Sequence, residues 1–141
     1  MKSFMKIFVF PILIVALIGC TNSETNQFDP NDLKRVDVLI TEENIGDTTT
    51  IMEAEKLKAL KEVFANIVWQ ENVKAQMARK EDVKATLFFK TEQNSPERLV
   101  EYFIWFNEND VSTTIIDREH HSYGTLPTED TKILKDILLN N

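Results

Sequence analysis

Two adjacent histidines beside acidic residues form the most chemically suggestive cluster of this sequence. Glu119, His120 and His121 closely follow Asp117, and imidazole and carboxylate groups are common ligands of transition metals. Adjacent residues on a strand point to opposite faces, so the two rings would converge only in a turn. A solvated turn is the favoured interpretation, and capture of a metal or small ligand by the turn from Asp117 to His121 is the alternative.

Other residue types with catalytic potential lack the surroundings that their chemistry needs. Ser95, Ser112 and Ser122 do not occupy the sharp strand-to-helix turn that activates a serine nucleophile. Glycine occurs only at positions 19, 46 and 124, which excludes a glycine-rich phosphate-binding loop. The run from Asn107 to Asp110 lacks the spacing and the glycine of a calcium loop. We therefore expect no catalytic residue, metal site or cofactor, and a protein that is not an enzyme; a hydrolase with a Ser–His–acid triad is a further alternative.

The single cysteine, Cys20, has the clearest chemical setting in the chain. It follows Gly19 and an unbroken apolar run from Ile7 to Ile18, and Lys2 and Lys6 precede that run. The run is too short for a membrane-spanning helix, which needs about 20 apolar residues, and is typical of a secretory leader. The ending Leu-Ile-Gly-Cys resembles the lipobox of bacterial lipoproteins, in which the cysteine thiol, a nucleophile as its thiolate, accepts diacylglycerol before the leader is cleaved.

This motif predicts three parts in the chain. Residues 1–19 would be a cleaved signal peptide, residues 20–33 a lipidated N-terminus with a flexible tether, and residues 34–141 a single folded domain. A flexible tether of this length reaches roughly 20 Å. We expect the domain to be anchored by its diacylglyceryl-cysteine on the extracytoplasmic face of the cell membrane. A signal anchor that is not cleaved is the alternative.

Composition and charge narrow the partners further. The chain of 141 residues is 43% hydrophobic, enough for one core, and its single cysteine rules out an internal disulfide. Its formal charge is −7, and loss of a leader that contains two lysines would make it −9. Phosphate backbones repel such an anion, so nucleic acid is excluded as an expected partner.

Hydrophobic periodicity predicts an α+β domain. The pattern alternates in six segments and changes to a helical period from Glu53 onward and again from Thr128, which we expect to cap the last helix. The predicted strands are 35–41, 48–52, 83–90, 99–106, 111–116 and 122–126. Short turns between consecutive strands favour an antiparallel meander with two helices packed on one face. The segment from Val68 to Glu81 is left open between helix and loop, because Trp69 and Met77 continue the helical spacing.

The strand from Leu99 to Phe106 is the most apolar stretch of the domain and carries several aromatic residues. Packing of Tyr102 and Phe106 beneath the helices is the favoured interpretation. If the helices covered only the other face, these two side chains would be presented to a partner.

This layout resembles the YhfM-like domain of small Gram-positive lipoproteins. The resemblance is carried by a lysine-rich helix that ends in Phe-Ala-Asn, by the aromatic strand Tyr-Phe-Ile-Trp-Phe and by a closing helix, and it covers Lys34 to Leu139 together with the leader. The family usually has proline and glycine after the first helix, and Val68 to Glu81 has neither. The resemblance implies a bacillus-type surface lipoprotein and brings no known activity with it. We expect a membrane-anchored, non-enzymatic domain that binds a protein or a small ligand.

Overall fold

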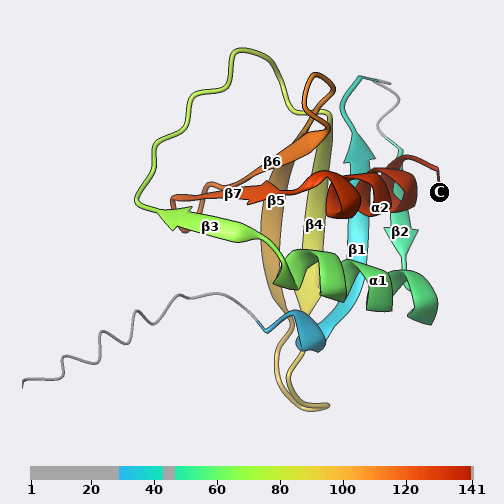
Figure 1. Ribbon diagram of the computed structural model, residues 1–141. Helices are drawn as coiled ribbons and strands as arrows, with labels where there is room; N and C mark the ends of the chain where they lie inside the picture. The colour runs from blue at the N-terminus through green and yellow to red at the C-terminus, as the bar shows by residue number, and fades with distance from the viewer. Residues whose placement is uncertain (1–28, 43–46, 141) are drawn as a thin grey trace, which may run out of the picture.

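The computed structural model describes residues 29–42 and 47–140, which form a seven-stranded antiparallel sheet with two helices on one of its faces (Figure 1). The strands are β1 (Leu33–Ile40), β2 (Thr48–Ile51), β3 (Val68–Glu71), β4 (Val83–Phe89), β5 (Arg98–Asn107), β6 (Ser112–Asp117) and β7 (Ser122–Leu126). The helices are α1 (Ala54–Ala65) and α2 (Thr128–Leu139). The α+β prediction is confirmed, including the position of both helices on the same face.

The sheet order is β2-β1-β4-β5-β6-β7-β3, so the predicted meander runs from β4 to β7. Strict alternation along β4 sends Val83, Ala85 and Leu87 to the helix face and the residues between them to the other face. This alternation divides the sheet into a buried helix face and a second face, because successive side chains of a strand point to opposite sides. The core therefore lies between the sheet and the two helices.

The helices contact each other and bury one side of each against the sheet. In α2, Leu134 and Leu138 are buried, whereas Ile133, which has the same apolar character, is 44% exposed. The expected role of Thr128 as N-cap is wrong by one residue: Pro127 is the N-cap, and Thr128 begins the helix. Glu129 lies in the first turn, where the helix dipole favours an anion.

The segment that was left open between helix and loop contains a strand that the sequence did not predict. The first helix ends at Ala65, and β3 pairs with β7 at the edge of the sheet. Trp69 lies directly opposite Gly124 in this pair, where the lack of a side chain makes room for the indole ring. A positive φ of 58° at Asn72 then ends the strand. The following connection, residues 72–82, is irregular and leads from β3 back to β4 (Figure 1).

The N-terminal boundary of the domain lies earlier than expected. Residues 30–32 form a short 3-10 helix, capped by the side chain of Asp29, and Leu33 begins β1 as a fully buried core residue. The expected flexible tether up to residue 33 is therefore too long at its C-terminal end. The leader and Cys20 lie outside the described residues. Within the described ranges, no helix is long and apolar enough to cross a membrane.

Candidate functional site

Strand register brings four polar side chains into one row on the helix face of the sheet. Tyr102 on β5 pairs with Asp117 on β6, Asp117 pairs with Ser122 on β7, and Ser122 pairs with Glu71 on β3. Directly opposite residues of antiparallel strands have Cβ atoms about 4.5–5.5 Å apart, so each member of this row lies beside the next. The row therefore joins a phenol, a hydroxyl and two carboxyl groups.

Asp117 holds the turn between β6 and β7 and a histidine of that turn. One of its carboxylate oxygens accepts hydrogen bonds from the backbone N–H groups of Glu119 and His120, both at 3.1 Å. The other lies 2.7 Å from Nδ1 of His120. Asp117 is only 7% exposed, so this arrangement is held in a protected position. A carboxylate bonded to Nδ1 fixes the orientation of the imidazole ring and directs Nε2 away from the carboxylate.

Tyr102 packs between aromatic rings at the centre of this region. Its ring centroid lies 5.7 Å from that of Phe64 on α1 and 5.5 Å from that of Trp69 on β3. Burial, with a further contribution from the Asp117 carboxylate, raises the pKa of Tyr102 well above its ordinary value. The phenol therefore keeps its proton at neutral pH and can act as a hydrogen-bond donor. Core packing of Tyr102 and Phe106 on the helix face is confirmed.

An apolar pocket of about 190 Å³ adjoins Tyr102. It lies between the C-terminal end of α1, β3 and the sheet, and its lining is almost entirely aliphatic and aromatic: Pro30, Phe64, Ala65, Ile67, Trp69, Leu87, Phe89 and Tyr102. A pocket of this size and character suits a short apolar group. The polar row therefore lies next to a place where such a group could be held.

The two adjacent histidines, His120 and His121, face different parts of the structure. His120 turns to Asp117, whereas His121, with a positive φ of 51°, lines a cavity that also includes residues of the 72–82 connection. Among residues 29–42 and 47–140, no three His, Cys, Asp or Glu side chains come together as a metal site would require. The turn from Asp117 to His121 is thus ordered by internal hydrogen bonds and does not assemble the three-ligand set of the metal-capture alternative.

Ser122 would need two links to form a Ser–His–acid triad with His120 and Asp117, and the structure has only one of them. Asp117 and His120 are joined, but Oγ of Ser122 donates a 3.3 Å hydrogen bond to the backbone carbonyl of His120 and is not aimed at the ring. Tyr102 was identified only as an aromatic residue, because its place in the row depends on strand register. The arrangement supplies a histidine that can accept a proton and a phenol that can donate one.

Comparison with known proteins yields one informative likeness. No family model matches the chain, and no curated protein matches it. A crystal structure of a thioesterase-like protein from Clostridium sporogenes is similar in fold, with a TM-score of 0.53 and 20% sequence identity. The match covers 77% of this chain and 96% of that chain. This likeness overturns the expectation of a protein that is not an enzyme, because the fold is shared with a thioesterase-like protein.

Proposed function

We propose that the domain hydrolyses a short acyl thioester or ester at the Asp117–His120 pair. The observation that carries this proposal is the 2.7 Å contact between Asp117 and Nδ1 of His120, beside the protonated phenol of Tyr102. The fold shared with a thioesterase-like protein supports the same reaction class. The adjoining pocket of about 190 Å³ limits the acyl group to a short one.

The residues would act as follows. The acyl chain occupies the apolar pocket, which places its carbonyl carbon near the polar row. His120, oriented by Asp117, takes a proton at Nε2 from a water molecule as its oxygen attacks the carbonyl carbon. The phenol of Tyr102 donates a hydrogen bond to the oxyanion that develops. The tetrahedral intermediate then collapses, the carbon–sulfur bond breaks, and the thiolate leaves with the proton from His120, giving a carboxylic acid and a thiol.

The test is release of free thiol from acyl thioesters of increasing chain length. We expect turnover with short acyl chains and a steep loss once the chain exceeds the pocket. His120→Gln should lower kcat by about 10²-fold or more, since general-base catalysis contributes typically 10²–10⁴-fold. Tyr102→Phe should lower kcat by a similar factor with little change in KM, because its hydrogen bond strengthens only in the transition state.

The chain offers a matched control in the neighbouring residue. His121→Gln changes the same residue type in the same turn but does not touch the Asp117 carboxylate, so it should keep full activity. Absence of turnover with the whole panel of thioesters and esters would refute the proposal. Equal losses in His120→Gln and His121→Gln would assign the effect to the fold of the turn and would also refute the role of His120.

We further propose that this domain is a lipoprotein, held on the extracytoplasmic face of the cell membrane through Cys20. The support is the leader and its Leu-Ile-Gly-Cys ending. Two or more acyl chains, at about 0.8 kcal/mol for each buried methylene, would make the anchoring stable without a membrane-spanning helix. Membership of the YhfM-like lipoproteins is part of the same proposal and rests on the sequence layout alone.

A further inference from the structure

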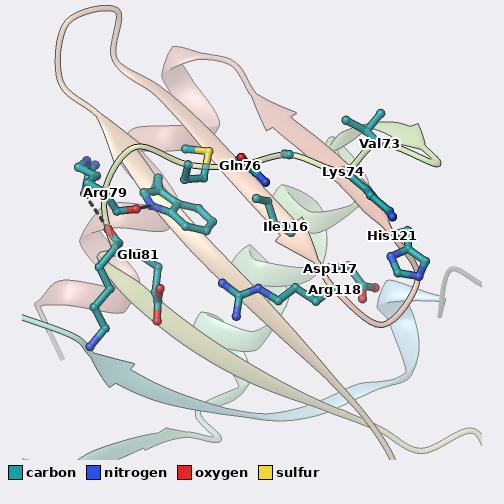
Figure 2. A pocket seen from close by; sticks show the side chains of 13 residues that line it. Val73, Lys74, Gln76, Arg79, Glu81, Ile116, Asp117, Arg118 and His121 are labelled. Carbon is teal, nitrogen blue, oxygen red and sulfur yellow. Dashed lines mark hydrogen bonds between the residues drawn. The ribbon is translucent and has the colours of Figure 1, made fainter.

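A second cavity lies on the opposite face of the sheet from the polar row. The connection of residues 72–82, named here the strap, crosses this face above β5 and β6 and encloses a groove of about 790 Å³ (Figure 2). The strap forms its roof, and the lining includes Trp105 and Ile116 of the sheet and Gln76 and Met77 of the strap. This volume is within the range of small-molecule sites, which is about 300–1,000 Å³.

Both ends of the strap are fastened to the sheet. At its beginning, the backbone N–H of Val73 donates to the carbonyl of His121 at 3.2 Å. At its end, Nε1 of Trp105 donates to the carbonyl of Arg79 at 3.0 Å. Arg79 also pairs with Asp82 through both guanidinium nitrogens and donates to the carbonyl of Phe106 at 3.0 Å. The groove is therefore a formed feature, with a roof held at two points.

The charge around this groove differs in sign from that of the whole chain. Lys74, Lys80 and Arg118 line it, and within the part of the chain that the structure describes no ion pair engages them. Two acidic residues, Glu81 and Asp117, also line the groove, and the carboxylate of Asp117 is bonded to His120. The chain as a whole carries −7. A local excess of basic groups on an acidic protein favours an anionic ligand at this place.

The guanidinium of Arg118 lies over an aromatic ring at one side of the groove. Its central carbon is 3.8 Å from the ring centroid of Phe103, a position that fixes the cation by attraction to the ring face. Figure 2 shows its side chain on the far side of Ile116 from Gln76. The groove thus combines an apolar floor with a positioned cation, which is the pattern that recognises a molecule with an apolar chain and an anionic head.

We propose that the strap groove binds a fatty-acid anion, with its chain along Trp105, Ile116 and Met77 and its carboxylate at Arg118. Apolar burial holds the chain and the cation selects the head, so a neutral or cationic amphiphile of the same length should bind more weakly. The groove borders on Asp117, but the proposed contacts with the fatty acid are made by other residues, so the proposal does not depend on the proposed hydrolysis.

Trp105 provides a direct measurement, because the chain contains only two tryptophans and Trp69 lies on the other face. The experiment uses the full chain with Trp69→Phe, in lipid nanodiscs, titrated with undecanoate that carries bromine at the end of its chain. Bromine quenches indole fluorescence on contact, and empty nanodiscs correct for partitioning. We expect saturable quenching of Trp105, with the same affinity by calorimetry for the unsubstituted chain.

Head-group and residue controls separate this site from non-specific uptake. The brominated alcohol and trimethylammonium compounds of the same chain length should bind at least about tenfold more weakly, and Arg118→Gln should weaken the acid by about tenfold, because one hydrogen bond to a charged group is lost. Lys58→Gln, an exposed change on α1, should leave binding unchanged. Equal quenching by all three head groups, or no saturable quenching, would overturn the proposal whatever the outcome of the thioester assays.

Discussion

Replacement of Gly124 by alanine tests whether the glycine is needed to make room for the side chains of Ile67 and Trp69. A Cβ atom at this position would lie 2.6 Å from Cγ2 of Ile67, 2.9 Å from Cζ3 of Trp69 and 3.0 Å from Cε3 of the same ring. Contacts this short require the neighbours to move. Trp69 cannot move alone, because it lies directly opposite in the β3–β7 pair and packs against Tyr102 at 5.5 Å.

Two effects of opposite sign decide the result of Gly124→Ala. Loss of glycine from the unfolded chain would stabilise the protein by about 0.4–1 kcal/mol, whereas overpacking of a filled site costs typically about 1–3 kcal/mol. Because two side chains are displaced at once, we expect the overpacking to win, with a net loss of about 1–2 kcal/mol in the free energy of unfolding. Equilibrium urea unfolding, followed by tryptophan fluorescence, measures this loss.

A second substitution makes the argument specific to the clash. Ile67→Ala removes the nearest atom, so the double variant should lose less stability than the sum of the two single variants, with a coupling of about 0.5 kcal/mol or more. Gly124→Ala that is as stable as the parent would show that the site has room and would refute the reasoning. Strict additivity in the double variant would place the cost elsewhere.

The remaining predictions concern the strap, the core and the anchor. Burial alone would raise the pKa of Asp82, but hydrogen bonds from Arg79 and from the backbone N–H of Phe106 outweigh it and hold the pKa below 3.8. These hydrogen bonds therefore stabilise the fold above pH 3.8, and their contribution is lost as the pH falls through the pKa of Asp82 in the folded protein. Thermal unfolding against pH should show this loss below about pH 4, and Asp82→Asn should be less stable at neutral pH by about 1.5–3 kcal/mol. Leu134→Ala should cost about 2–5 kcal/mol in urea unfolding, and the exposed Ile133→Ala should stay within about 0.5 kcal/mol. Cys20→Ala should abolish metabolic labelling with palmitate while the domain stays folded, and labelling that persists would contradict the lipobox interpretation.

Much of the architecture could be predicted because the strands of the meander are long and alternate cleanly. Hydrophobic periodicity did not predict β3. Trp69, Val73 and Met77 recur every four residues, which is a helical spacing, yet Trp69 packs on the helix face of the sheet and Met77 lies over the other face. A strand of four residues is too short to show its own period, and its place at the edge of the sheet depends on the space at Gly124.

Only the part of the candidate site that lies in one short segment could be predicted from the sequence. The turn from Asp117 to His121 was marked by its residue types, but which histidine faces the carboxylate depends on the positive φ at His121. The row from Tyr102 through Ser122 to Glu71 exists only through the register of four strands, two of which are far apart in sequence. No spacing in the chain encodes that register.

The order of the strands also bears on how copies of this domain behave when they are crowded together. An unpaired strand edge is a template for association with another chain, and the risk grows with its length and apolar character. The edges of the described sheet are β2 and β3, four residues each, with three threonines in the first and a glutamate in the second. The long aromatic strand β5 is paired on both sides. The sequence most able to form intermolecular β-structure is thus kept at the interior of the sheet, and aggregation of the native domain through it would first require β4 or β6 to detach.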